Sequence, residues 1–307
     1  MKASPLIVIT GPTAVGKTKL AIAVAHKLKG EIINADSRQV YKKMDIGTGK
    51  DLADYTIGGE KIPYHLIDIC EPGYQYNIKE YQLDFDTVYQ SIQDQQKPAI
   101  LCGGSGLYIE SAIEGNPYAF VPIHKKLRDT LHDESKSRLI DRIEKDIQRQ
   151  LNITSNTTTK RLIRAIEISE HMKNNHEGFY KSKKLAAEIF VLTFDRATVK
   201  ERIIKRLRYR LEHGLIEEVK GLLAIGLRPE QLLYYGLEYR WVTLYVMGEL
   251  TYEAMFERLN IAIRQFAKRQ MTWFRRMEKR GYQLNWLDGT EPLSVLTDQI
   301  LKKINSR

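Results

Sequence analysis

The stretch ITGPTAVGKTKLA, residues 9 to 21, fits the phosphate-binding pattern G-x-x-x-x-G-K-[ST] without a mismatch. An apolar, β-branched run at residues 6 to 9 predicts a buried strand before it, and helical periodicity begins at Lys17. A strand, a glycine turn and a helix in this order point backbone N–H groups and a helix N-terminus at one anion. The alternative is a chance turn, but the context on both sides favours a phosphate site.

Two side chains of this loop carry the phosphate chemistry. Lys17 would neutralise phosphate oxygens, and the hydroxyl of Thr18 would bind a Mg²⁺ ion that bridges them. The pattern alone identifies neither the phosphorylated ligand nor whether any bond is hydrolysed.

The composition predicts a folded protein with an acidic partner. Of 307 residues, 43% are hydrophobic, which is enough for one large core and a second, smaller one. Lys and Arg number 48 against 38 Asp and Glu, so the net charge is +10 and nucleic acid is the first partner to consider. A soluble enzyme that is merely basic is the alternative.

The sequence shows no targeting or metal-cage pattern. Residues 1 to 5 lead directly into the first strand and no apolar run approaches about eighteen residues, so we expect no signal peptide, no membrane contact and a cytoplasmic protein. Cys70 and Cys102 lack C-x-x-C spacing and the histidines are scattered. These features predict buried thiols rather than a disulfide or a zinc site.

Strand and helix patterns alternate through the first third of the chain. We predict strands at 31–35 and 64–70, a helix at 79–95, and a strand, glycine turn and helix within 98–113. This order favours an α/β fold with a parallel sheet between two helical layers.

After Asn116 the β-rich runs stop, and residues 124 to 175 are polar and charged with helical spacing. We therefore predict an all-helical insertion at 116–182 within an α/β core formed by 1–115 and 183–307. The sheet resumes with a strand at 185–195. One long basic helix follows at 196–223, then further helices to about Gly281 and an edge strand at 282–288.

Polar residues follow two of the predicted strands. Asp36 to Gln39 come after the second strand, where an α/β sheet places its ligand, and Asp36 is a candidate Mg²⁺ ligand or general base. The alternative is that Asp36 caps the next helix. Ser105 lies in GGSG, residues 103 to 106, which is either a ligand-facing turn or only a tight strand-to-helix turn.

Two basic segments have helical spacing. In TTTKRLIRAIEI, residues 157 to 168, Lys160 and Arg164 are one turn apart and Leu162 lies on another face. A solvated basic face is the alternative there. In the helix predicted at 258–280, Arg264 and Lys268 belong to a cationic stripe opposite an apolar one, which suits a phosphate backbone.

The chain resembles the tRNA dimethylallyltransferases, also called tRNA isopentenyltransferases, in a divergent, bacterial type. The matching stretches follow the family's order and cover most of the chain: GPTAVGKTKLA, ADSRQVYKKMDIGTGK, LIDICEP, GGSGLY, KRLIRAIEI, GLIEEV and RQFAKRQMTWFRR. The resemblance implies a fold like that of P-loop NTPases. It also implies transfer of the dimethylallyl group of dimethylallyl diphosphate to the exocyclic amine of the adenosine just 3′ of a tRNA anticodon, with that base flipped into a channel.

The resemblance assigns roles to residues of this sequence. Lys17, Thr18 and Asp36 are implied to be catalytic, with Thr18 on Mg²⁺ and Asp36 as the general base. The diphosphate-binding residues are Gly11, Pro12, Thr13, Ala14, Val15, Gly16, Lys17 and Thr18. The residues implied to contact the tRNA anticodon stem-loop are Asp36, Ser37, Arg38, Gln39, Ser105, Arg128, Lys160, Arg161, Leu162, Ile163, Arg164, Arg264 and Lys268. Nothing in the sequence requires more than a monomer.

The sequence departs from the family pattern near residue 233. An arginine is common three residues before a Gly-Tyr pair, where this chain has Leu233, and Arg240 or Arg208 is a candidate to supply the missing contact to diphosphate. Two other functions stay open. A P-loop kinase would share the loop and the Mg²⁺, and a non-catalytic RNA-binding protein would keep only the fold.

Overall fold

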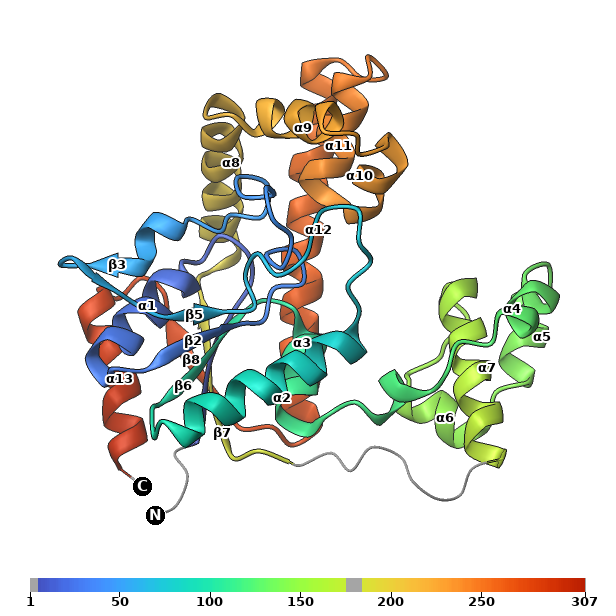
Figure 1. Ribbon diagram of the computed structural model, residues 1–307, viewed down its shortest axis with the longest axis horizontal. Coiled ribbons are helices and arrows are strands. Elements are labelled where there is room, and N and C mark those ends of the chain that lie inside the picture. The colour runs from blue at the N-terminus through green and yellow to red at the C-terminus, as the bar shows by residue number, and fades with distance from the viewer. Residues whose placement is uncertain (1–4, 175–183, 307) are drawn as a thin grey trace. The chain divides into compact units, whose positions relative to one another are not determined.

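The computed structural model describes residues 5–174 and 184–306, and a six-stranded sheet forms the centre of its larger unit (Figure 1). The strand order is β5-β2-β6-β1-β7-β8, and every pair of neighbours is parallel. The strands are β1 (Leu6–Thr10), β2 (Glu31–Asn34), β5 (Tyr64–His65), β6 (Ala99–Gly103), β7 (Ala187–Thr193) and β8 (Leu284–Asp288). The predicted parallel α/β fold is confirmed, and residues 284–288 form the expected edge strand.

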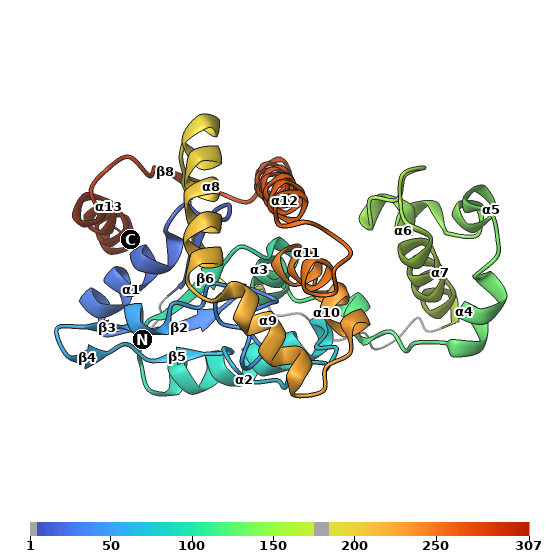
Figure 2. The ribbon, with the colours of Figure 1, turned by 90° about the horizontal axis from the view of Figure 1, so that it is seen from above.

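Helices cover both faces of this sheet, because successive side chains of a strand point to opposite sides. Ile7 and Ile9 of β1 pack in a core with α1 (Lys17–Leu28) and α13 (Leu293–Asn305), which lie side by side in Figure 2. Leu6 and Val8 pack on the other face, whose helices are α2 (Ile78–Asp94), α3 (Gly106–Glu114) and the end of α12 (Tyr252–Lys279). β1, β2 and β6 are buried along their whole length, as expected for covered parallel strands.

A second group of helices forms its own core beyond the carboxyl ends of the strands. It packs apolar side chains of five helices against residues that follow β2, among them Val40, Tyr41 and Met44. The helices are α8 (Arg196–Glu212), α9 (Leu215–Ala224), α10 (Pro229–Tyr235), α11 (Leu237–Val246) and the first part of α12. A short helix η1 (Leu52–Tyr55) and the antiparallel pair β3 (Thr56–Ile57) and β4 (Glu60–Lys61) precede β5.

The chain divides into two compact units, residues Met1–Ile113 with Lys184–Arg307, and residues Glu114–Lys183. Within its described residues the smaller unit, here called the insertion, has a separate apolar core that includes Leu131, Leu139 and Leu162. Its helices are η2 (Pro117–Phe120), α4 (Lys125–Leu131), α5 (Lys136–Asp141), α6 (Lys145–Gln150) and α7 (Thr159–Asn174). Across the described part of the chain, no helix is long and apolar enough to cross a membrane.

Two of the predicted secondary-structure elements are wrong, and Cys70, expected to be a buried thiol, is only half-buried. The strand expected at 64–70 ends at His65, because Leu66 and Asp68 adopt positive φ values of 60° and 56°, which leave the extended region. The single helix expected at 196–223 is two helices, α8 and α9. Gly214 separates them with a φ of 99°, a left-handed conformation that glycine adopts without a Cβ clash.

The insertion core provides a test of what Leu162 does. Its side chain is 0% exposed, so truncation in Leu162→Ala should lower the free energy of unfolding by about 2–5 kcal/mol. Exposed Lys160→Ala, two residues away, should change it by no more than about 0.5 kcal/mol. The measurement is urea unfolding followed by circular dichroism, since residues 114–183 contain no tryptophan. A stable Leu162→Ala protein with weakened RNA binding would contradict this assignment.

Candidate active site

The phosphate-binding loop joins β1 to α1 at the carboxyl edge of the sheet. A Cβ on Gly11 would lie 2.2 Å from the carbonyl oxygen of Leu192 in β7, so only glycine allows this close approach. Helix α1 begins at Lys17 with no side-chain cap and no acidic residue in its first turn. Its first N–H groups are therefore available to an anion, and the helix dipole favours one.

Gln270 of α12 holds the loop from the opposite side. The Thr13 N–H donates to Gln270 Oε1 at 2.8 Å, and Gln270 Nε2 donates to the Gly104 carbonyl at 2.9 Å. Arg202 of α8 adds a third restraint, with Nε donating to the Ala14 carbonyl at 2.8 Å. The sequence prediction missed Gln270. The sequence did offer one signal for this residue. Gln270 is an amide on a stripe of α12 that is otherwise apolar, with Ile263, Ala267 and Phe274.

A small cavity of about 50 Å³ lies beside the loop and is lined by Lys17, Thr18, Asp36 and Cys102, among others. Lys17 Nζ donates to the Pro12 carbonyl at 3.3 Å. Burial lowers the pKa of Lys17, and the negative charge of Asp36 works against this shift. Lys17 is half-buried and has no ion-pair partner among the residues that the structure describes, so a bound anion would stabilise its charge.

Asp36 and Ser105 meet because β2 and β6 are neighbouring parallel strands that end at the same edge. The Asp36 carboxylate accepts from the Arg38 N–H at 2.9 Å through Oδ1. No hydrogen bond from a described residue is recorded at Oδ2. Ser105 Oγ accepts from the Ser37 N–H at 3.1 Å. Asp36 therefore does not cap a helix: residues 37–40 form a turn, and the carboxylate closes its first part.

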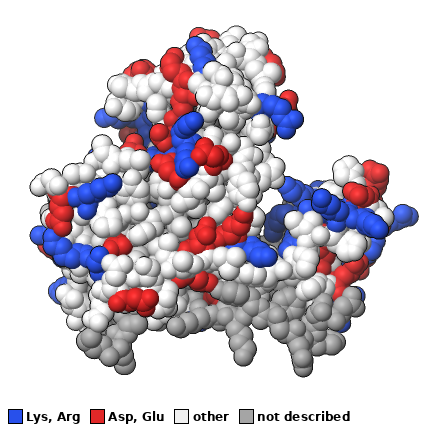
Figure 3. Space-filling model, viewed as in Figure 1, with Lys and Arg blue, Asp and Glu red and all other residues white. Residues whose placement is uncertain are grey.

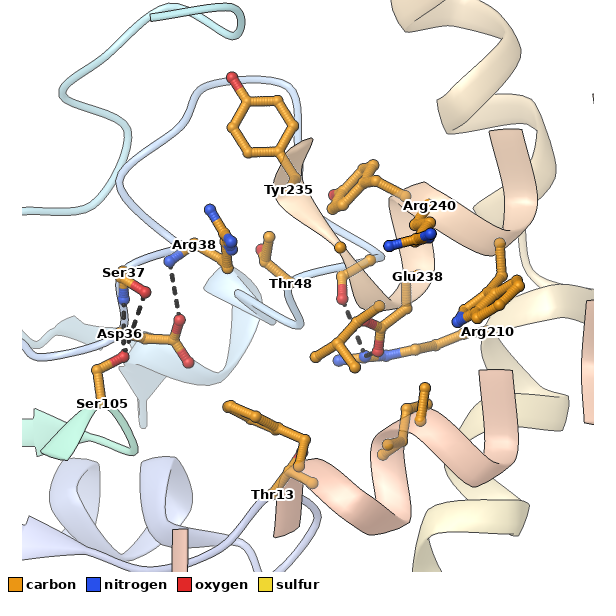
Figure 4. A pocket seen from close by; sticks show the side chains of 18 of the residues that line it. Thr13, Asp36, Ser37, Arg38, Thr48, Ser105, Arg210, Tyr235, Glu238 and Arg240 are labelled. Carbon is orange, nitrogen blue, oxygen red and sulfur yellow. Dashed lines mark hydrogen bonds and ion pairs between the residues drawn. The ribbon is translucent and has the colours of Figure 1, made fainter. Parts of the chain in front are cut away.

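A larger cavity of about 470 Å³ adjoins the small one (Figure 4). Asp36, Arg38 and Ser105 lie on one side of it, and Arg210 and Glu238 lie on another. The two cavities have five lining residues in common: Thr13, Asp36, Thr48, Arg206 and Phe266. The arrangement has room for a small phosphorylated ligand at the loop and a second, larger substrate next to it, with one carboxylate bordering both.

Of the other residues predicted to contact tRNA, Arg38 lines the larger cavity and Gln39 lines the small one. Arg38 lies over the ring of Tyr235 at 5.5 Å, while Gln39 Nε2 donates to the Gly49 carbonyl at 3.1 Å. Arg264 and Lys268 are exposed on α12 and line neither cavity.

The predicted tRNA contacts of the insertion are largely engaged within the insertion itself. Arg128 donates twice to buried Glu167, at 2.7 and 2.8 Å, and Arg164 donates to the same carboxylate at 2.9 Å. Leu162 and Ile163 are buried in the core, so their side chains are not on the surface. Arg161 donates to the Leu151 carbonyl at 3.2 Å, and Lys160 is exposed. Figure 3 shows Lys and Arg side chains gathered on the insertion.

The arginines at the larger cavity agree only in part with those named from the sequence. Arg240 lines it, but Arg208 lines neither cavity and lies over the ring of Phe256 instead. Sequence reasoning missed Arg206 and Arg210, although their spacing of four residues places them on one face of α8. It missed them because the helix is basic all round, so spacing alone does not show which face meets the site.

The fold and the two cavities define a P-loop α/β protein that binds a phosphorylated ligand beside a second substrate. The chain belongs to the IPP transferase family, whose model matches residues 39–277. It is 48% identical to tRNA dimethylallyltransferase 1 of Parabacteroides distasonis and 47% identical to tRNA dimethylallyltransferase 2 of Phocaeicola vulgatus, each over 100% of both chains.

Two solved structures show the same fold. The tRNA isopentenylpyrophosphate transferase of Staphylococcus epidermidis superposes with a TM-score of 0.69 at 31% identity, covering 98% of this chain and 99% of the other. That of Bacillus halodurans superposes with a TM-score of 0.70 at 29% identity, covering 99% and 97%. The predicted family and fold are confirmed.

The reactivity of the Cys102 thiol tests whether the small cavity is closed to solvent. Cys102 is buried, and burial raises the pKa of its thiol to about 11, against about 8.5 for a free cysteine. Because the pKa is raised, the thiol stays protonated at pH 8 and ionises only as the pH rises toward 11. Iodoacetamide at pH 8 should therefore alkylate Cys102 about a hundredfold more slowly in the folded protein than in urea. Peptide mass spectrometry measures both rates, and equal rates would mean an open, ionised site.

Proposed function

We propose that this chain transfers the dimethylallyl group of dimethylallyl diphosphate to the exocyclic amine of the adenosine 3′ of a tRNA anticodon, releasing diphosphate. The observation that carries the proposal is the position of Asp36, which borders both the phosphate-loop cavity and the larger one. Family membership and the tRNA dimethylallyltransferases of similar sequence support the same reaction. In this proposal the diphosphate occupies the small cavity and the flipped adenosine enters the larger one.

The residues divide the chemistry between leaving group and nucleophile. As the bond from carbon to diphosphate oxygen breaks, negative charge grows on the diphosphate, and Lys17 with the free N–H groups of α1 stabilises it. The allylic cation is delocalised and is attacked by the amine nitrogen. An aromatic amine is a weak nucleophile, so its proton must leave as the new bond forms, and the Asp36 carboxylate accepts it.

The small cavity also suits a Mg²⁺ ion bound with the diphosphate. Thr18 and Asp36 both line it and offer oxygen, the ligand type that Mg²⁺ prefers. In the described residues no cluster of three or more His, Cys, Asp or Glu side chains is placed to hold a metal. A Mg²⁺ ion at Thr18 would therefore share its coordination with diphosphate oxygens and water, and it would supply charge neutralisation for the leaving group.

Exposed cations are assigned to the tRNA phosphates. Lys160 of the insertion, with Arg264 and Lys268 on α12, is free to reach phosphate oxygens, whereas Arg128 and Arg164 chiefly hold the insertion together through Glu167. Ser37, Arg38 and Ser105 line the larger cavity and are placed to hold the flipped nucleotide. Both cavities are formed by one chain, so the proposed reaction requires no second copy.

The direct test is incubation of the protein with Mg²⁺, unmodified tRNA and dimethylallyl diphosphate, followed by mass analysis of the nucleosides. A five-carbon addition to one anticodon-loop adenosine supports the proposal. ATP consumption with a small acceptor and no change in tRNA would replace it with a kinase, and tRNA binding without any turnover would indicate a non-catalytic RNA-binding protein.

The same assay tests the assigned base. Asp36→Asn removes the proton acceptor but keeps the shape of the side chain, so the transfer rate should fall by about 10²- to 10⁴-fold while tRNA affinity changes little. Asp298→Asn, on the exposed face of α13, is the matched control and should leave the rate unchanged. Full turnover by the Asp36 variant would show that another group takes the proton.

A further inference from the structure

Two arginines one turn apart on α8 meet at the wall between the cavities. A Cβ built on Gly49 would lie 1.8 Å from Nη2 of Arg210 and 2.0 Å from Nη2 of Arg206, so the two like-charged groups lie close to each other. Gly49 itself lines the small cavity beside Lys17 and Thr18. Two guanidinium groups this close repel each other unless an anion lies near both.

The protein supplies only part of that negative charge. Arg210 Nη1 donates to Glu238 Oε1 at 3.3 Å and to the Gly47 carbonyl at 3.2 Å. Arg210 is 8% exposed, yet its Nη2 is buried with no hydrogen-bond partner among the described residues. No hydrogen bond or ion pair is recorded between Arg206 and any described residue. A buried, unsatisfied guanidinium N–H is costly and calls for an acceptor.

The electrostatics agree with this geometry. Burial, reinforced by the positive charge of Arg210, lowers the pKa of Arg206 to about 10. Burial also raises the pKa of Glu238, and Arg210 opposes that rise. The cluster therefore carries more positive than negative charge in a place where water is largely excluded, and a bound anion relieves both the repulsion and the desolvation.

We propose that Arg206 and Arg210 form a second anion-binding wall of the active site and bind the diphosphate of the prenyl donor together with Lys17. This inference rests on the proposed function for the identity of the donor. Arg206 carries the assignment to the diphosphate, because it lines the small cavity together with the phosphate loop. Arg210 borders the larger cavity, where Figure 4 shows it beside Glu238 on the side away from Asp36.

Arg206 and Arg210 would stabilise the same diphosphate charge as the phosphate-binding loop does, but from a different element of the fold. The helix N-terminus and Lys17 belong to the turn after β1, whereas the two arginines belong to a helix packed against that turn through Arg202. Guanidinium groups present fixed, paired N–H donors that match two oxygens of one phosphate. As the carbon–oxygen bond of the donor breaks, the electron pair goes to the diphosphate, and these donors stabilise the added charge.

The test is calorimetric titration of the purified protein with inorganic pyrophosphate in Mg²⁺ buffer without tRNA. Arg210→Met keeps the length of the side chain and removes its charge and donors. We expect it to weaken pyrophosphate binding about tenfold or more, and Arg206→Met to do the same. Arg208→Met is the control, because Arg208 lies on the same helix outside both cavities, and it should bind like the parent protein.

A second arm distinguishes the diphosphate from a tRNA phosphate, which offers the same chemistry. Both variants should keep the parent affinity for tRNA and should raise the KM for dimethylallyl diphosphate rather than that for tRNA. Unchanged pyrophosphate binding, or a loss confined to tRNA affinity, would overturn the inference. If Arg210→Met does not fold, Arg210→Lys serves instead, because it keeps the charge but loses the paired donors. In that case the contradicting result would be a folded Arg206→Met protein that binds pyrophosphate like the parent protein.

The two proposals fail in different ways. If the parent protein binds pyrophosphate and the arginine variants do not, the anion-binding wall is supported even when no dimethylallyl group reaches tRNA. If the parent protein transfers the group and the variants bind pyrophosphate normally, the proposed function is supported and the anion-binding wall is contradicted. A parent protein that does not bind pyrophosphate at all contradicts the wall directly.

Discussion

Two hydrogen bonds of one buried amide, that of Gln270, hold the active site in a single arrangement. They join the phosphate loop after β1 to the glycine turn after β6, and they anchor both to α12. Asp36 and Ser105 depend on the same edge, because β2 pairs with β6 and their carboxyl ends stop side by side. Hydrogen bonds that satisfy buried backbone groups on separate elements restrain those elements more strongly than a surface contact does.

The charge distribution follows from that framework. A helix N-terminus and the half-buried Lys17 face a small cavity from one element. Arg206 faces the same cavity from another element, with Arg210 close beside it. Packing and the carboxylate of Glu238 partly offset the repulsion between Arg206 and Arg210. A site that is strained in this way before its ligand arrives gains the most when the ligand is a polyanion whose charge increases during the reaction.

Local patterns predicted the central part of the fold well and the connections poorly. The apolar runs at β1, β2, β6 and β7 are buried strands because their neighbours cover both faces. The run at 64–70 also contains several apolar residues but leaves the sheet after His65, since nothing local reveals that Leu66 turns into the left-handed region. At residues 160–164 the family resemblance implied tRNA contact. In the structure Arg164 donates to Glu167, a pairing that forms only once the helix has folded.

Short motifs in their order along the chain were enough to predict the phosphate loop, the α/β class and the family, and to suggest Asp36 as the base. Each of these depends on residues that are neighbours in sequence or follow one another in a recognisable order. The folded chain was needed to show which arginines face the cavities and that Gln270 joins two glycine turns. It was also needed to show that Arg210 has a buried donor with no partner among the described residues. Burial and charge compensation depend on distances between segments far apart in sequence, and these distances exist only after the helices have packed.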